Sequence, residues 1–427
     1  MNDQQNTPSR RKFLSRTTSL TAGAATLGMF TRPALGFHNS DDDALKIGLI
    51  GCGGRGTGAV RNIIQADSRS KITALADAFP DRIKLTSDIL QTDDKDNYDV
   101  ADDHIFTGVN CHEEIVKTDV DIIVLATPPH FRPAQMEAAV NAGKHVFCEK
   151  PVAVDVPGAL RVLAACEKAE ANGQSVVSGL CWRYDTSINE MMSRLEEGAI
   201  GDIRAIEANY LTGTLWYRTP KPDQVWSPME NQLRNWIYYN WLSGDHIAEQ
   251  HIHSIDKALW AYGDVPPVAC YGVGGRLART EEKWGNVYDH FTTVYEWEDG
   301  RKAFCHCRQM DGCFNQTNDH VYGTDGIAGI LSRTISTAEG EVKIKAGKRS
   351  MYVNEQDELV KSIRAGIPIN NGAYMTNSTL MALMGRDAAY TGKRIKWEDY
   401  IKSEVVLGPK SYDEPDYVPD TVAIPGR

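Results

Sequence analysis

Residues 46–58 read KIGLIGCGGRGTG, a short apolar strand followed by a glycine-rich turn, and the next residues, AVRNIIQA, have the apolar spacing of a helix. The turn carries the pattern Gly51-x-Gly53-x-x-Gly56, with Gly54 and Arg55 as its intervening residues. In such a turn the first glycine permits the bend, the second lets a pyrophosphate approach the backbone, and the third lets helix pack on strand. Free N–H groups at the helix start favour bound phosphates. The stretch therefore predicts a dinucleotide site in which all five of these residues take part.

A second apolar run, KITALAD, ends at Asp77, 21 residues after Gly56. A carboxylate at this position can accept a hydrogen bond from a ribose hydroxyl, which favours NAD over NADP. Arg55 and Arg82 are basic residues near the same site, so NADP remains an alternative cofactor.

Strand-like and helix-like runs alternate through residues 45–182, which predicts a doubly wound parallel sheet, an α/β fold of Rossmann type. Ligands bind such sheets beyond the carboxyl ends of the strands. The residues expected there, as cofactor-binding candidates beside the glycine turn and Asp77, are Thr127, Pro128, His130, Glu149 and Lys150.

From about residue 184 the pattern changes to one helix and then to longer alternating strands around 202–211, 268–275, 289–309 and 320–331. The pair Asp299-Gly300 is a hairpin signal. This half is expected to be an α+β domain on an open, mostly antiparallel sheet. The predicted division is a signal peptide at 1–36, an NAD-binding Rossmann domain at 37–183, a substrate and oligomerisation domain at 184–405, and a tail at 406–427 that is extended or disordered.

The glycine turn, ATPPHF at 126–131 and CEKP at 148–151 together resemble the Gfo/Idh/MocA oxidoreductases, the family of glucose-fructose oxidoreductase and inositol dehydrogenase. The resemblance spans nearly the whole chain after the signal. It implies that Lys150 lies beside the nicotinamide and contacts the hydroxyl that reacts, and that Arg183 and Tyr184 bind substrate. It also implies that the open sheet forms the floor of the substrate site and the interface of a homodimer or homotetramer.

The stretch EQHIHSID at 249–256 resembles the family's helix start, with Glu249 in the place of an Asp and His253 as the catalytic base, which also contacts substrate. A spacing of four on a helix puts Glu249 and His253 on one face, so the carboxylate can orient the imidazole. Glutamate in place of aspartate, and His251 where the family often has glycine, are departures from the pattern.

Two other interpretations of this stretch stay open. His246, either Glu249 or Gln250, and His253 share a helical face and could bind a metal ion, although the His-Glu-x-x-His order is absent. Alternatively, the stretch is a polar helix start without chemistry. We expect acid/base chemistry and no metal.

Composition excludes some classes of protein. Apolar residues make up 42% and charged residues 24%, and 57 acidic against 46 basic residues give a net charge of −11, which argues against nucleic acid as a partner. The nine cysteines have no framework spacing and are expected to be buried thiols. Cys305 and Cys307 share one face of a strand, so a zinc site there is a weaker alternative.

The first 36 residues contain the twin arginines Arg10 and Arg11 and then a mild apolar run that ends in Ala34-Leu35-Gly36. This pattern predicts a twin-arginine export signal, with an ordinary secretory signal as the alternative, and no stable membrane anchor. The twin-arginine machinery would then be a partner and the periplasm the destination. Because that route carries folded proteins, the cofactor is expected to be bound before export and to stay bound.

The sequence thus predicts an exported NAD(P)-dependent oxidoreductase that transfers a hydride between a nicotinamide and a hydroxyl of a sugar, glycoside or polyol. One alternative is an NAD-dependent glycosidase that works by transient oxidation, elimination, hydration and re-reduction. Another is a sugar-binding protein without catalysis. The aromatic residues of 220–242 are expected to form a loop over the substrate site or to pack on a neighbour, and His290 and Arg308 are expected to serve strand pairing.

Overall fold

The apolar runs of the first half form a sheet of six parallel strands in the order β3-β2-β1-β4-β5-β6. The computed structural model describes residues 43–427, so the predicted signal peptide lies outside the described residues. The strands are β1 (Lys46–Ile50), β2 (Lys71–Asp77), β3 (Ile105–Thr107), β4 (Ile122–Leu125), β5 (His145–Cys148) and β6 (Val176–Ser178). The predicted doubly wound parallel sheet is confirmed.

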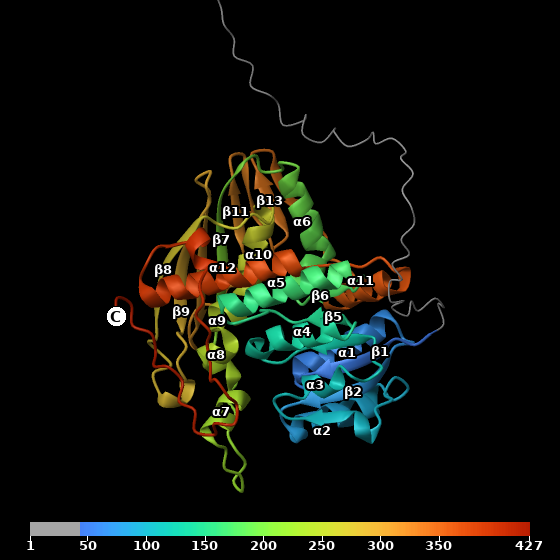
Figure 1. Ribbon diagram of the computed structural model, residues 1–427. Helices are drawn as coiled ribbons and strands as arrows, with labels where there is room; N and C mark the ends of the chain where they lie inside the picture. The colour runs from blue at the N-terminus through green and yellow to red at the C-terminus, as the bar shows by residue number, and fades with distance from the viewer. Residues whose placement is uncertain (1–42) are drawn as a thin grey trace, which may run out of the picture. The chain divides into compact units, whose positions relative to one another are not determined.

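Helices cover both faces of this sheet (Figure 1). Apolar side chains of α1 (Gly54–Ala66) and α2 (Pro80–Asp93) form one core with Ile47, Leu49 and Val124. On the opposite face, α3 (His112–Ile115), α4 (Arg132–Asn141) and α5 (Val156–Ala171) share a second core with Ile123 and Leu125. Because the sheet is buried on both faces, its strands are continuous apolar runs.

The second sheet has nine strands in the order β14-β13-β12-β11-β7-β10-β9-β8-β15. They are β7 (Ile203–Thr212), β8 (Ala269–Gly275), β9 (His290–Glu296), β10 (Lys302–Gln309), β11 (His320–Gly323), β12 (Gly326–Gly329), β13 (Thr334–Thr337), β14 (Gly340–Lys343) and β15 (Ile395–Lys396). All neighbours pair antiparallel except β7 and β10, which run parallel. The predicted open, mostly antiparallel sheet is confirmed, and the β9–β10 hairpin turns at Asp299-Gly300, where Gly300 has φ +87°.

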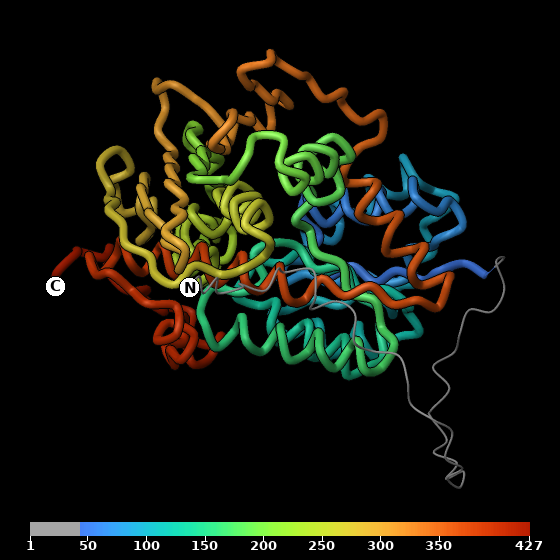
Figure 2. Tube along the Cα trace, turned by 90° about the horizontal axis from the view of Figure 1, so that it is seen from above, coloured from blue at the N-terminus to red at the C-terminus, as the bar shows by residue number. Residues whose placement is uncertain are grey.

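One face of the nine-stranded sheet is packed and the other is open. Side chains of α10 (Ile252–Ala261) and α12 (Gly372–Thr391) share the buried core with the inward residues of β7, β9 and β10, and α12 also lies along α5 (Figures 1 and 2). The outer face leaves large apolar side chains exposed, among them Tyr271, Val273, Phe304 and Ile327. α6 (Thr186–Glu196) enters this half directly after the short turn Cys181–Tyr184, where the predicted domain boundary falls.

Two late segments of the chain return to the first half. α11 (Met351–Ala365) packs on α1, and its Leu359 and Val360 belong to the core of the parallel sheet. The tail after residue 405 has no helix or strand, but its backbone is bonded along its length: Leu407 N–H donates to Asp155 and Ala423 C=O accepts from Tyr288. These bonds hold the tail, which has no helix or strand, against the folded chain.

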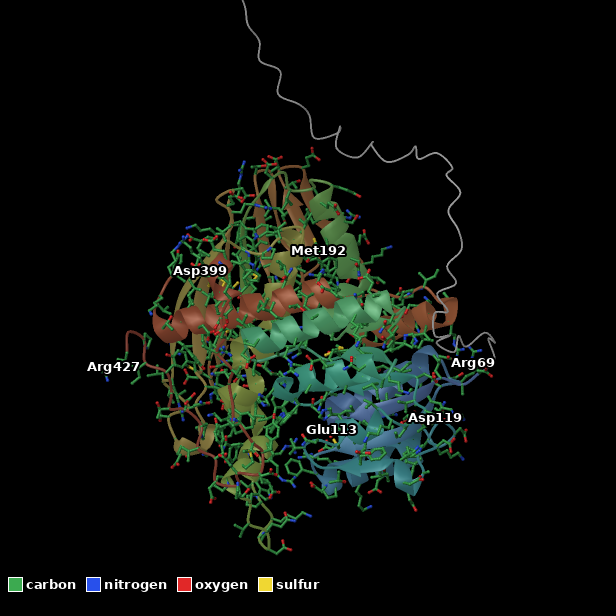
Figure 3. The ribbon with its side chains drawn as sticks, in the orientation of Figure 1. Arg69, Glu113, Asp119, Met192, Asp399 and Arg427 are labelled. Carbon is green, nitrogen blue, oxygen red and sulfur yellow. The ribbon has the colours of Figure 1, made fainter. Side chains whose placement is uncertain are left out.

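The surface of the N-terminal half is charged, and most of the cysteines are buried. Charged side chains such as Arg69, Glu113 and Asp119 stand on the outside of the N-terminal half (Figure 3). Eight cysteines are buried free thiols and Cys313 is exposed and free. Within residues 43–427 no helix combines the length and apolarity that crossing a bilayer demands.

Candidate functional site

The glycine turn between β1 and α1 has the geometry that dinucleotide binding requires. Gly51 has φ +100°, and a Cβ there would stand 2.6 Å from the backbone of Ala126. A Cβ on Gly56 would stand 2.1 Å from the carbonyl oxygen of Gly51, so only glycine lets α1 approach the turn this closely. Gly53 and Gly54 face open space, and no side chain caps the first amides of α1. The start of α1 therefore lacks a side-chain cap and has room beside its first amides, a cradle that suits a pyrophosphate.

Asp77 ends β2 beside this cradle. Its carboxylate accepts hydrogen bonds from the backbone N–H groups of Cys52 (2.7 Å) and Phe79 (2.9 Å), which fix its orientation. Burial raises the pKa of Asp77 above its ordinary value, although both amides and Arg82 oppose the shift. The position and the fixed carboxylate fit a ribose diol, whose two hydroxyls donate hydrogen bonds.

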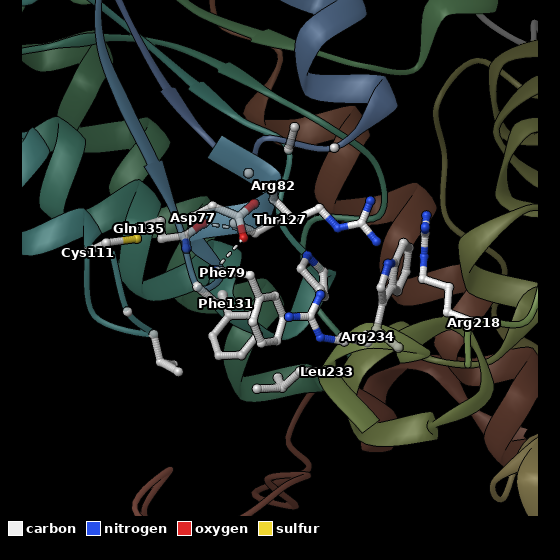
Figure 4. A pocket seen from close by; sticks show the side chains of 18 of the residues that line it. Asp77, Phe79, Arg82, Cys111, Thr127, Phe131, Gln135, Arg218, Leu233 and Arg234 are labelled. Atoms are coloured by element: carbon white, nitrogen blue, oxygen red, sulfur yellow. Dashed lines mark hydrogen bonds between the residues drawn. The ribbon is translucent and has the colours of Figure 1, made fainter. Parts of the chain in front are cut away.

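A cleft with about 760 Å³ of space not filled by protein atoms joins these features. It is lined by Gly51, Gly53 and Asp77, by Gly108 and Cys111 after β3, and by Thr127 and Pro128 after β4. Figure 4 shows Asp77, Thr127 and Gln135 on one side of it and Arg218, Leu233 and Arg234 on the other. The last three come from the second half of the chain, so the cleft runs between the parallel sheet and the segment that follows β7.

Arg132 holds together the loops at the strand ends. Its buried guanidinium donates to the carbonyl oxygens of Thr127 (2.6 Å), Glu149 (2.8 Å) and Pro151. Thr127 also donates its hydroxyl to Gln135 at 2.6 Å. The loops after β4 and β5, which carry the predicted cofactor-binding residues, are therefore fixed relative to each other by one cation.

Lys150 follows β5 and is paired with Glu249. Its ammonium donates to the Glu249 carbonyl oxygen and lies 3.2 Å from the Glu249 carboxylate, and the two side chains are only 14% and 17% exposed. This contact joins the edge of the parallel sheet to the turn that precedes α10. It places the predicted lysine, with its charge balanced, at the junction of the two halves.

His253, in the first turn of α10, is a neutral imidazole. Burial lowers its pKa well below the ordinary value, and the positive charges of Lys150, Lys257 and Arg55 lower it further. Its Nδ1 is buried and has no hydrogen-bond partner among the described residues. A neutral imidazole has a free nitrogen lone pair, which a proton acceptor needs, while burial and the neighbouring positive charges weaken its basicity.

The predicted pairing of Glu249 with His253 is wrong in this structure. The sequence predicts one continuous helix, but α9 (His246–Glu249) ends before α10 begins at Ile252, and the Glu249 carboxylate bonds Lys150. The break is stabilised by the side chain of Gln250, which accepts from Gln309 at 2.7 Å. Gln309 in turn accepts from the buried Arg279. Nothing in the spacing of residues 243–260 indicated this interruption.

Three predicted site residues have partners elsewhere. His130 points into a separate cavity, where its Nε2 lies 2.7 Å from the Tyr412 hydroxyl of the tail, and burial lowers its pKa to about 4. Arg183 is paired with Asp256 (2.8 Å) and Asp264 (2.6 Å). The Tyr184 hydroxyl donates to Asn371 at 2.6 Å. Each of these three residues has a partner within the fold and none of them lines the cleft. Lys150, Glu249 and His253 do not line it either.

Arg55 and Glu149 form a third group, next to Lys150. The Arg55 guanidinium lies 2.5 Å from the Glu149 carboxylate and 3.3 Å from that of Glu355 on α11, and it stacks 4.6 Å over the ring of Tyr352. Burial raises the pKa of Glu355 well above its ordinary value, and the negative charge of Glu149 adds to the shift. Glu355 and Tyr352 carry no motif, so sequence alone could not have linked them to the glycine turn.

The remaining histidines of the stretch serve the fold. The His246 ring lies 3.0 Å from Asp245, and the His251 ring lies 3.1 Å from the Ala208 carbonyl oxygen and is kept neutral by burial, with a pKa of about 3. Among residues 43–427 no group of three or more His, Cys, Asp or Glu side chains is arranged to hold a metal ion. The metal interpretation of residues 243–260 and the zinc alternative at Cys305 and Cys307 therefore have no ligand set there.

These features define a class: a dinucleotide-dependent oxidoreductase built on a parallel sheet and an open, mostly antiparallel sheet. Comparison with known proteins supports this class of protein. Residues 45–175 match the oxidoreductase family model with an NAD-binding Rossmann fold, and residues 188–328 match the GFO/IDH/MocA C-terminal domain. The chain belongs to the Gfo/Idh/MocA family of oxidoreductases, as its motifs predicted, and its N-terminal domain is an NAD-binding Rossmann fold.

Individual relatives are distant. A 2,7-anhydro-N-acetylneuraminate hydratase of Escherichia coli is 24% identical over 58% of this chain and 60% of its own length, so the match spans less than two thirds of that relative. An inositol 2-dehydrogenase of Rhizobium meliloti is 22% identical over 81% of this chain and 96% of its own. Among solved structures, an aldose-aldose oxidoreductase of Caulobacter crescentus superposes with a TM-score of 0.65 at 21% identity, over 83% of this chain and 99% of the other. The structural likeness establishes the fold.

Proposed function

We propose that this protein transfers a hydride between a nicotinamide cofactor and a hydroxyl-bearing carbon of a sugar, glycoside or polyol. The observation that carries the proposal is the Lys150–Glu249 pair beside the neutral His253, at the edge of the sheet that carries the glycine turn. An acid/base pair and a dinucleotide cradle at one strand edge are what alcohol oxidation by hydride transfer requires.

Each side chain has a separate task in this reaction. His253 accepts the hydroxyl proton, since its imidazole is neutral. Lys150 donates to the same oxygen and stabilises the alkoxide as charge develops. Glu249 positions the ammonium, and Arg132 holds the loop from which Lys150 projects. The cradle residues Gly53 and Gly54, with Asp77 and Thr127, would hold the dinucleotide. A bound nicotinamide supplies the hydride acceptor.

The relatives support the substrate class. The named inositol dehydrogenase and aldose-aldose oxidoreductase act, by their names, on a polyol and on sugars. A second candidate is a closed redox cycle in which the cofactor is oxidised and reduced on one sugar, as in the glycosidase alternative. The hydratase favours it, since its name describes addition of water without net oxidation.

Export and assembly are part of the proposal. Arg10 and Arg11 support export to the periplasm by the twin-arginine route, with the cofactor bound before export and regenerated within the site. The exposed apolar side chains on the outer face of the nine-stranded sheet support a homodimer or homotetramer through that face.

The first experiment is to express residues 37–427, purify the protein without added nucleotide, denature it, and identify any released nucleotide by mass spectrometry and absorbance. We expect stoichiometric NAD or NADH. Incubation with sugars, glycosides and inositols then separates the two candidates: a keto product with reduced cofactor indicates net oxidation, whereas a hydrated or cleaved product with unchanged cofactor indicates the closed cycle. A protein that releases no nucleotide and binds no added NAD would refute the proposal.

A further inference from the structure

One wall of the dinucleotide cleft is built by the second half of the chain. The segment 213–239, which follows β7 and contains α7 (Pro228–Arg234), contributes Trp216, Arg218, Leu233, Arg234 and Trp236 to the cleft that Gly51, Gly53 and Asp77 line from the other side. The sequence left two roles open for the aromatic residues of 220–242, a loop over the substrate site or packing on a neighbour. The structure places Leu233, Arg234 and Trp236 of this range on the wall of the cofactor cleft (Figure 4).

The segment 213–239 is held firmly in this position. The fully buried Asn235 accepts from the backbone N–H of Arg218 at 2.8 Å and donates to its carbonyl oxygen at 3.0 Å. Arg234 reaches across to the first half, where it lies 2.9 Å from Asp81 and stacks 3.9 Å over the ring of Phe79. The wall is therefore fixed to both halves of the molecule.

The arginines that line the cleft, from this wall and from the opposite side, differ in their acidic partners. Arg234 has two acidic partners, Asp81 and Glu230. Within residues 43–427, neither Arg218 nor Arg82 has a carboxylate within ion-pair distance, and Arg218 lies 4.4 Å over the ring of Trp216. Burial lowers the pKa of Arg218, and its positive neighbours Arg82 and Arg234 lower it further against the opposing charge of Asp81.

Guanidinium groups that line a cleft without an ion-pair partner have free N–H donors, which can bind an anion. The cleft already has the cradle for a pyrophosphate and the carboxylate for a ribose, so the anion that fits is part of the same ligand. Building on the proposed function, we propose that Arg218 and Arg82 bind a phosphate of the dinucleotide, Arg218 reaching it from the C-terminal half.

Two anionic groups of a dinucleotide can accept hydrogen bonds from these guanidinium groups. They are the pyrophosphate, present in NAD and NADP, and the 2′-phosphate, present in NADP alone. The test uses protein of residues 37–427 freed of nucleotide with charcoal, and titration calorimetry with NAD and with NADP. The variants are Arg218→Gln and Arg82→Gln, with Arg218→Lys to keep the charge. Arg204→Gln, at an exposed ion pair with Asp202 on the far sheet, is the matched control.

We expect Arg218→Gln and Arg82→Gln each to raise Kd by roughly 10- to 100-fold, since a hydrogen bond to a charged group is lost, and Arg218→Lys to raise it less. Equal losses for NAD and NADP indicate the pyrophosphate; a loss for NADP alone indicates the 2′-phosphate. The amount of nucleotide that copurifies with each variant should fall as its Kd rises. If the glutamine variants melt at the wild-type temperature and bind both nucleotides like the control, the inference is wrong. Wild-type protein that binds neither nucleotide would instead overturn the proposed function.

Discussion

Lys257 and Asp319 form a buried ion pair behind the candidate base. Lys257 lies one turn of α10 beyond His253, its ammonium is 2.6 Å from the Asp319 carboxylate, and both side chains are about 1% exposed. At an effective dielectric constant near 20, two unit charges at this separation attract by about 6 kcal/mol. Removing both charges from water costs several kcal/mol per ion, so the net contribution of the pair is small. Removal of one charge is therefore far more costly than removal of both.

We expect Lys257→Met to lower the free energy of unfolding by about 3–5 kcal/mol, because it leaves the Asp319 carboxylate buried with no counter-ion. The Asn209 N–H, 3.0 Å from Asp319, is a hydrogen-bond donor but carries no charge. Lys257→Met combined with Asp319→Asn removes both charges, and the asparagine oxygen can still accept from Asn209. The double variant should recover most of the loss, to within about 2 kcal/mol of wild type.

The test is urea unfolding followed by tryptophan fluorescence. It is run on wild type, Lys257→Met, Asp319→Asn and the double variant. The four free energies of unfolding give the coupling energy between the two positions. A loss below about 1 kcal/mol in Lys257→Met, or losses that simply add in the double variant, would contradict the burial argument. The same variants test the site: because Lys257 lowers the pKa of His253, its replacement by Met should raise that pKa, which NMR of the imidazole protons can follow.

Three further predictions concern the cradle, the acid/base pair and pH. Gly56→Ala should abolish tight NAD binding, because its Cβ would stand 2.1 Å from the Gly51 oxygen, whereas Gly58→Ala, which faces open space, should bind NAD in calorimetry like wild type. His253→Asn and Lys150→Met should each slow hydride transfer by about 10²- to 10⁴-fold in single-turnover absorbance, with NAD affinity nearly kept; turnover near the wild-type rate would exclude either role. The unfolded chain protonates its histidines below about pH 6.5, but desolvation in the fold lowers the pKa values of His130, His251 and His253. Stability should therefore fall as pH drops from 6.5 towards 4. The expected loss is about 1.4 kcal/mol per pH unit for each such histidine, and a flat urea midpoint between pH 6.5 and 5.5 would contradict it.

The parallel sheet was predictable because its signals are local. The glycine turn, Asp77 and the strand ends at Thr127 and Lys150 all follow from residues close in sequence, and regular strand–helix alternation admits few topologies. The sequence predicted that the second sheet is open and mostly antiparallel, but not its strand order or its one parallel pair. The strands at 334–343 and the parallel pairing of β7 with β10 depend on contacts between distant segments.

Within the candidate site, the break between α9 and α10 was the main failure of sequence reasoning. It depends on Gln309 and Arg279, which lie on other elements and act on Gln250 through side-chain bonds. The partners of His130, Arg183 and Tyr184 were missed for the same reason, since each comes from a segment more than 70 residues away.

The sequence by itself determined the cofactor class and the family, because backbone geometry in a glycine turn depends on residue type and short spacing. The roles of Lys150 and His253 are predictions that come from the resemblance to the family. Only the tertiary structure decided how these groups are used. It turned Glu249 towards Lys150, lowered the pKa of His253 by burial, and placed Arg218 of one half in the same cleft as Asp77 and Arg82 of the other. These are effects of desolvation and long-range packing, and no local pattern encodes them.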